Sequence, residues 1–253
     1  MKKKTRVILV ACATAVIGSA ALLAGYTVLK HKNVALPEEF TITAHTGCEN
    51  SADNSLEAIR LGYISGADIV EFDLNFNSEG IPVLSHDEPA AGVVTLEEAF
   101  RSLTEYEGLR INIDVKKADD LEAVVSLSEK YGLRDRIFYT GIEEAKVAAV
   151  QSQTPDVMYY LNADVDKTKS TDREYLLSLA EKVESSGAVG INMWYGACSK
   201  ELVSLFRERG LLVSIWTVNS ELSMLKMLEL APDNITTRNP SRLKELVINK
   251  TNK

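Results

Sequence analysis

The sequence predicts an α/β fold, a (β/α)8 barrel of the TIM type with a β-hairpin after its second strand. Three observations lead to this prediction. Short β-branched or aromatic runs alternate with longer helical patterns along the body of the chain. The alternating units number eight, and eight parallel βα units close into a barrel. The 253 residues, 45% of them hydrophobic, suffice for one large core, and no second domain or internal repeat is visible.

The eight predicted strands are short runs rich in β-branched and aromatic residues. They lie at 40–45, 68–74, 110–115, 136–140, 157–162, 188–193, 211–218 and 234–237. A further run at 81–84 follows the turn Ser78-Glu79-Gly80. Because this connection is too short for a parallel crossover, it predicts an antiparallel return, the hairpin after the second strand.

Helical patterns separate these strands. They lie at 56–65, 95–104, 119–131, 142–151, 171–185, 199–209, 220–229 and 241–248. The residues Asp53-Asn54-Ser55 offer N-cap chemistry for the first of them. Since barrels of this type carry their chemistry at the C-terminal ends of the strands, polar residues at those ends are the first candidates for a functional site.

The N-terminal part of the chain differs in composition from the rest. Residues 7–29 form an uncharged apolar run of 23 residues with four bases before it and two after it. This pattern predicts a single transmembrane helix, with residues 1–33 forming a cytoplasmic end, signal anchor and flank. The barrel at 34–253 would then be extracellular at the cell membrane. Two alternatives are cleavage near residues 18–20 and a lipoprotein box ending at Cys12, which has few apolar residues before it.

The net charge of −8 conceals an uneven distribution. Residues before Glu38 contribute six bases and no acid, so 22 of the 28 bases face 36 acids in the rest of the chain, a net charge of about −14 there. An acidic body argues against nucleic acid as a partner and against electrostatic docking on anionic lipid.

Two cysteines of the body, Cys48 and Cys198, both follow predicted strands at the same end of the barrel. Outside the cell they could form a disulfide, or they could remain free buried thiols. Their spacing does not decide between these alternatives, and no zinc-type pairing is present.

Carboxylates interrupt two neighbouring predicted strands. Glu71 and Asp73 are two residues apart in an apolar run, so both point to one face, and Asp114 lies near the end of the next parallel strand. A divalent cation with oxygen ligands, Ca²⁺ or Mg²⁺, would offset their repulsion. The alternative for the first pair is an edge strand with solvated acids.

Two histidines are expected at the same end of the barrel. His45 ends the first strand, and the hairpin brings His86 towards the carboxylates. Lys116 should point to the same side as Asp114 and could meet an anionic substrate, although a lysine at a strand end is usually solvated. A metal that offsets phosphoryl charge, with one imidazole as base and another as acid, fits cleavage of a phosphodiester.

At these residues the sequence resembles the glycerophosphodiester phosphodiesterase family, over most of its body. The similar motifs are Ala44-His45-Thr46-Gly47, Asp53-Asn54-Ser55-Leu56, Gly66-Ala67-Asp68 with Glu71-Phe72-Asp73, Gly80 to Val83 with His86-Asp87, Thr95 to Glu98, Ile113 to Lys116 and Trp216 to Asn219. Their order and spacing together are specific.

The resemblance implies roles for these residues. His45 and His86 would be the catalytic acid/base pair, and Glu71, Asp73 and Asp114 the metal ligands. Substrate contacts are expected from Lys116, Trp216 and Arg238. The products would be glycerol 3-phosphate and an alcohol.

The chain departs from the family pattern at four positions. It has Thr46 where the family has Arg, Asp53 and Asp114 where it has Glu, and Arg238 in place of a late Asp. Because the last strand of a barrel lies about 4.8 Å from the first, Arg238 could take over the phosphate contact of the missing Arg, or it could pair with a surface carboxylate. Residues 88–95 form only a short link where many members carry an insertion, so the site should be open.

Three other functions remain possible at this point. A glycoside hydrolase could use two of the carboxylates, but both histidines would then have no role. A membrane-tethered binding module could have kept the fold and lost activity. Asp114 also resembles the ligand of spider-venom sphingomyelinase D, a related barrel, which leaves a lysophospholipid-like substrate open.

Overall fold

The computed structural model describes residues 26–251 except 28 and 31. The predicted transmembrane helix at 7–29 therefore lies almost wholly outside the described residues. Within the described part of the chain, no helix is both long enough and apolar enough to cross a membrane.

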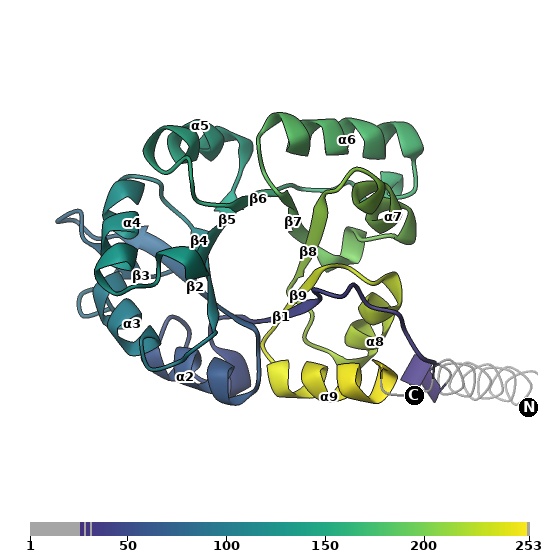
Figure 1. Ribbon diagram of the computed structural model, residues 1–253, viewed down its shortest axis with the longest axis horizontal. Helices are drawn as coiled ribbons and strands as arrows, with labels where there is room; N and C mark the ends of the chain where they lie inside the picture. The colour runs from purple at the N-terminus through teal and green to yellow at the C-terminus, as the bar shows by residue number, and fades with distance from the viewer. Residues whose placement is uncertain (1–25, 28, 31, 252–253) are drawn as a thin grey trace, which may run out of the picture.

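Eight parallel strands form a closed ring around the centre of the molecule (Figure 1). They are β1 (Thr41–Ala44), β2 (Ile69–Phe76), β4 (Arg110–Val115), β5 (Ile137–Ile142), β6 (Tyr159–Asn162), β7 (Gly190–Trp194), β8 (Leu212–Trp216) and β9 (Asn234–Thr237). Parallel pairing of β1 with both β9 and β2 closes the ring. The predicted barrel is thus confirmed.

The predicted hairpin is also present. The short strand β3 (Pro82–Leu84) pairs antiparallel with the end of β2, and Leu84 lies opposite Leu74. Asn77 closes the turn, because its side chain accepts from the backbone N–H groups of Glu79 and Ile81. The hairpin therefore brings the segment after β3 back to the C-terminal end of the barrel.

Eight helices of the described chain surround the strands (Figure 1). They are α2 (Leu56–Ile64), α3 (Leu96–Leu103), α4 (Leu121–Lys130), α5 (Glu144–Gln153), α6 (Arg173–Ser185), α7 (Lys200–Glu208), α8 (Glu221–Leu230) and α9 (Pro240–Thr251). Each turns apolar residues towards the ring; in α7, for example, Leu202, Val203 and Phe206 are fully buried. One continuous core between helices and strands results.

Two boundaries differ from the prediction in ways that affect the site. The predicted strand 136–140 continues to Ile142, and α5 begins at Glu144 instead of residue 142. The cause is a bend at Gly141, which has a φ of 72°. At this bend the register between β5 and β6 shifts, between Tyr139 and Ile142. The predicted strand 211–218 ends at Trp216.

Both cysteines of the described chain are free thiols. Cys48 is buried beside α2 and its sulfur donates to the carbonyl oxygen of Ala58 at 3.3 Å. Burial raises the pKa of the Cys48 thiol to about 11 and that of Cys198 to about 12. Of the two alternatives from the sequence, the structure has the free thiols and not the disulfide.

Candidate active site

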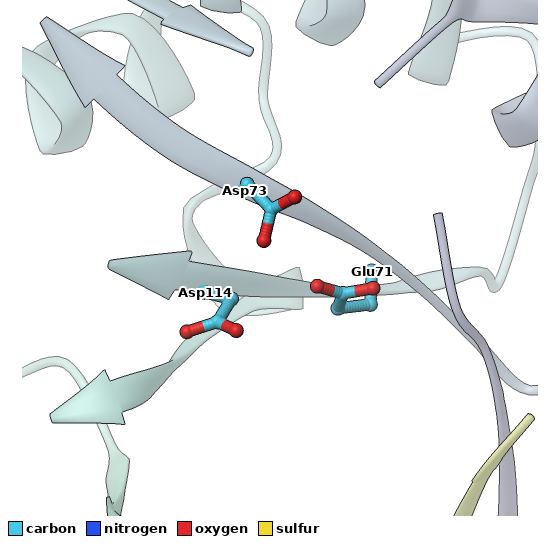
Figure 2. A group of neighbouring side chains, drawn as sticks. All are labelled: Glu71, Asp73 and Asp114. Atoms are coloured by element: carbon cyan, nitrogen blue, oxygen red, sulfur yellow. The ribbon is translucent and has the colours of Figure 1, made fainter. Parts of the chain in front are cut away.

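Three carboxylates meet where β2 and β4 run side by side. The strand register places Asp73 opposite Asp114, and Glu71 lies two residues before Asp73 on the same face. One carboxylate oxygen from each residue lies within 4.8 Å of the others. Figure 2 shows the three side chains projecting from these two neighbouring strands. The structure therefore brings together the three acids that the sequence singled out.

Backbone and amide groups hold two of these acids in place. The backbone N–H of Thr46 donates to Glu71 Oε2 at 2.9 Å. The side chain of Asn54 donates to Asp73 Oδ2 at 2.8 Å and accepts from the Asp73 backbone N–H at 3.0 Å. Since the helix α2 is capped by Ser55, the preceding Asn54 is free to serve the site. Both acids are thus fixed before any ligand binds.

The acidic cluster carries one internal counter-charge. The Lys116 ammonium lies 2.9 Å from Asp73 Oδ1 and 2.9 Å from Asp114 Oδ2. Burial acts to lower the pKa of Lys116, but the charges of Asp114 and Asp73 outweigh it and raise the pKa above its ordinary value. Lys116 therefore stays protonated, and three acids share one positive charge.

Glu71 is the acid of this cluster whose pKa is raised. Burial, then the neighbouring charges of Asp73 and Asp114, raise the pKa of Glu71 well above its ordinary value. The Thr46 N–H and the Lys116 charge oppose this rise but do not cancel it. A further positive charge at the cluster would favour the ionised form of Glu71.

The donor atoms fit a hard divalent cation. All three groups are carboxylates, the ligands that Ca²⁺ and Mg²⁺ prefer. Among the residues that the structure describes, the buried Oδ1 of Asp114 has no hydrogen-bond partner. An unpaired buried carboxylate oxygen is costly, and a metal ion is one way to satisfy it. Glu71, Asp73 and Asp114 are therefore the residues that could hold a metal.

His45 lies beside the cluster, directly after β1. Its Nδ1 donates to the carbonyl oxygen of Thr46 at 2.8 Å and lies 3.9 Å from Glu71 Oε2. Burial first, and the charge of Arg238, lower the pKa of His45, while the Thr46 carbonyl and nearby acids act against this. A neutral His45 with its proton on Nδ1 presents an unprotonated Nε2, as a general base requires.

His86 lies in the segment that the hairpin returns to the barrel mouth. Its Nδ1 is 2.9 Å from Asp87 Oδ1, and its side chain is 66% exposed. An adjacent carboxylate orients the imidazole, and an oriented imidazole at the barrel mouth could act as a general acid.

Arg238 follows β9 and forms an ion pair. Its Nη1 lies 2.7 Å from Asp53 Oδ1, and the side chain is 39% exposed. The pair packs over Gly47, whose φ is 72° and where a Cβ would lie 2.6 Å from Arg238 Nη1. Arg238 thus lines the cavity and pairs with a carboxylate, as the second alternative from the sequence holds, while its contact with phosphate stays a prediction.

One open cavity of about 420 Å³ joins these residues. All of the site residues expected from the sequence line it, namely His45, Glu71, Asp73, His86, Asp114, Lys116, Trp216 and Arg238. Trp216 is the last residue of β8 and is 37% exposed at the rim. The structure therefore places every expected residue at one site and leaves none of them elsewhere.

Among the residues at the site that sequence reasoning missed, two hold other parts of it in place. Asn54 was assigned to helix capping, although its motif position beside Asp53 carried the signal. Lys146 lines the cavity from α5, and its ammonium donates to the carbonyl oxygens of Val115 at 2.7 Å and Gly141 at 2.8 Å. No spacing in the sequence marks Lys146, because the bend at Gly141 brings it there.

Comparison with known proteins points to one family. The model of the glycerophosphoryl diester phosphodiesterase family matches residues 43–111 and 93–242. A glycerophosphodiester phosphodiesterase of Caldanaerobacter subterraneus subsp. tengcongensis is 24% identical over 238 residues, which is 81% of this chain and 97% of the relative. One of Bacillus altitudinis is 24% identical over 241 residues, 79% of this chain and 95% of the relative.

A solved structure shows the same fold. A phosphodiesterase of Oleispira antarctica, in complex with the product sn-glycerol-3-phosphate, superimposes with a TM-score of 0.69 at 20% identity. The match covers 84% of this chain and 97% of that protein.

Proposed function

The chain belongs to the glycerophosphoryl diester phosphodiesterase family, and from this premise we propose that it hydrolyses glycerophosphodiesters to glycerol 3-phosphate and an alcohol with the help of a divalent cation. The match to the family model and the named relatives confirm two predictions from the sequence motifs: the family and the enzyme class, a phosphoric diester hydrolase. The substrate, the metal and the roles of individual residues are the proposal.

One observation carries it: the cluster of Glu71, Asp73 and Asp114, both histidines and Lys116 border a single cavity. A carboxylate cluster alone would suit several reactions. The two imidazoles add a proton acceptor and a proton donor, and a glycoside hydrolase would leave them without a task. The relatives that are named glycerophosphodiester phosphodiesterases support the same reaction.

In the proposed reaction, His45 and His86 divide the proton transfers. Nε2 of His45 takes a proton from the attacking oxygen, which forms the new bond to phosphorus. If this oxygen is that of water, glycerol 3-phosphate forms directly; if it is the neighbouring glycerol hydroxyl, a cyclic phosphate forms, which a water molecule then opens to glycerol 3-phosphate. The bond from phosphorus to the leaving oxygen breaks, and His86 donates a proton to that oxygen, so the alcohol leaves neutral. The carboxylate of Asp87 keeps the imidazole of His86 oriented for this step.

Positive charge is needed around the phosphoryl oxygens, where negative charge increases in the transition state. Ca²⁺ or Mg²⁺ held by Glu71, Asp73 and Asp114 would supply most of it as a Lewis acid. Lys116 adds one charge from within the cluster. Arg238 can add a planar pair of donors from β9, and Trp216 can bound the substrate at the rim.

The direct test is product identification. Glycerophosphocholine and glycerophosphoethanolamine are incubated with the protein and Mg²⁺ or Ca²⁺, and glycerol 3-phosphate is followed by ³¹P NMR. The proposal expects glycerol 3-phosphate from the wild type and none above background from Asp73→Asn. Binding of the diesters without any product would support the inactive binding module instead.

We also propose, from the sequence alone, that residues 7–29 anchor the chain in the cell membrane with the barrel outside. The uncharged apolar run and the basic residues before it support this. Protease added to intact cells should then digest the barrel, and the barrel should stay with the membrane after an alkaline wash. Release of the barrel by that wash would refute the anchor.

A further inference from the structure

We propose that Gly141 and Lys146 are positioning residues that fix Asp114 as the third metal ligand. This inference rests on the proposed function, because it assumes that the carboxylate cluster binds a divalent cation. Neither residue touches the substrate in this proposal. Both act through Asp114, from the bend at the end of β5, the strand next to β4.

Gly141 makes room for the Asp114 carboxylate. A Cβ at position 141 would overlap Asp114 Oδ1 and lie 2.8 Å from both the backbone N and O of Val115. Two of these atoms belong to the rigid backbone and the third is a ligand oxygen, so an added methyl group must displace the Asp114 carboxylate or the backbone that carries Val115. Gly141 also has a φ of 72°, and its N–H donates to Asn162 Oδ1 at 2.9 Å, which ties the bend to β6.

Lys146 closes the bend from the other side. Its ammonium donates to the carbonyl oxygen of Val115, the residue after Asp114, and to that of Gly141. One ammonium therefore ties the end of β4 to the bend of β5. Since it has two carbonyl partners within 2.8 Å, Lys146 is occupied in holding backbone and is not placed as a free counter-charge.

The carboxylate of Asp114 is consequently held on two sides. Lys116 donates a hydrogen bond to Oδ2. Oδ1 occupies the space that a side chain at position 141 would fill, and it has no hydrogen-bond partner among the described residues. Metal ligation needs oxygens placed to within a few tenths of an ångström, and groups that orient ligands typically contribute about 10- to 100-fold to metal affinity. A shift of Asp114 should therefore appear first as weaker metal binding.

The first test compares two glycine substitutions by isothermal titration of the metal-depleted protein with Mn²⁺, Mg²⁺ and Ca²⁺. Gly141→Ala and Gly210→Ala put a side chain on backbones with almost the same φ, 72° and 71°. At Gly210 a Cβ would meet nothing within 4 Å, so this variant carries the backbone strain alone. We expect a Kd at least tenfold higher for Gly141→Ala, and a Kd near the wild-type value for Gly210→Ala.

The second test uses the charge of Lys146. Lys146→Met removes one positive charge near the acids, which by electrostatics alone should leave cation binding unchanged or tighten it. The positioning role predicts the opposite, a Kd several-fold higher. Lys117→Met is the control, because Lys117 is a neighbouring lysine whose ammonium pairs with the exposed Glu88 at 2.9 Å. This arm also decides the matter if Gly141→Ala does not fold.

The outcomes separate the two proposals. A wild-type protein that binds none of the three ions overturns both the metal-dependent function and the positioning role. A wild type that binds metal while Gly141→Ala matches Gly210→Ala, or while Lys146→Met binds as tightly as Lys117→Met, overturns only the positioning role. Circular dichroism melting curves fix a titration temperature at which each variant is folded.

Discussion

The ring nitrogens Nδ1 of His45 and His86 both face oxygen atoms, the Thr46 carbonyl and the Asp87 carboxylate. Each Nε2 thus remains for the substrate. We predict that His45→Ala and His86→Ala each lower kcat by about 10²-fold or more, which is the contribution expected of a positioned acid or base. Steady-state kinetics at saturating metal measure this. Near-full kcat in His86→Ala would exclude the two-histidine mechanism.

The burial of His45 has a consequence for the pH profile. Its lowered pKa means that the unprotonated base persists below the ordinary value of 6.5. As the pH falls, kcat/KM should therefore decline only when it passes through this lowered pKa. We predict an acid limb of kcat/KM at a pH below 6.5, measured from about pH 4.5 to 9 at saturating metal. A limb above 6.5 would show that another group titrates.

Arg238 can bind phosphate only in competition with Asp53, its partner at 2.7 Å. We predict that Arg238→Ala lowers kcat/KM for a glycerophosphodiester by about tenfold or more, since a guanidinium matches phosphate oxygens well. Asp53→Asn, which frees the guanidinium, should not lower it. If both variants reduce kcat/KM equally, the ion pair stabilises the loop and Arg238 does not contact the substrate.

For single residues, the sequence predicted which side chains line the cavity better than it predicted the hydrogen bonds between them. Each of the three acids and both histidines reached the cavity, because strand alternation and strand ends determine where they point. The two hydrogen bonds between Asn54 and Asp73 could not be predicted, since they depend on how the loop after β1 folds over β2.

Among the elements, α3 has the clearest local signal. The Thr95 hydroxyl accepts from the Glu98 backbone N–H at 3.2 Å, and the Glu98 carboxylate accepts from the Thr95 backbone N–H at 2.8 Å, which together form a capping box. We predict that Thr95→Ala lowers the free energy of unfolding by about 1 kcal/mol, as the loss of an N-cap does. Urea unfolding measures this. If Thr95→Ala lost activity under conditions in which the variant is fully folded, α3 would influence the site directly, and a purely local effect on stability would be excluded.

Elements with such local signals were predictable, and those shaped by neighbours were not. Thr95 and the turn before β3 lie within a few residues of the structure they specify. The predicted boundary between β5 and α5 was wrong because the bend at Gly141 depends on residues of the two neighbouring strands, Asp114 of β4 and Asn162 of β6.

For the whole molecule, counting βα units predicted the barrel, because a parallel sheet of eight units closes on itself. Closure also explains how His45 after β1 and Arg238 after β9, 193 positions apart in the chain, come to border one cavity. The strand register was beyond the sequence, yet it is the register that sets Asp73 opposite Asp114 and so creates the metal site.

The metal requirement is the central claim, and Glu71 gives it a pH signature. Because the pKa of Glu71 is raised in the metal-free protein, a cation competes with protonation of this carboxylate, so metal affinity should increase with pH. Glu71→Gln, which cannot ionise, should bind metal more weakly and lose most of this pH dependence. Isothermal titration with metal at pH 6 and pH 8 compares the wild type with Glu71→Gln.

One measurement tests the account most directly: hydrolysis of glycerophosphocholine by metal-depleted protein during titration with Mg²⁺ or Ca²⁺, with metal binding followed calorimetrically on the same samples. The account predicts no turnover in excess chelator, and turnover that increases in proportion to occupancy of one site, with Glu71→Gln shifted to higher metal concentration. Full activity in excess chelator, with no metal bound to the protein, would contradict it.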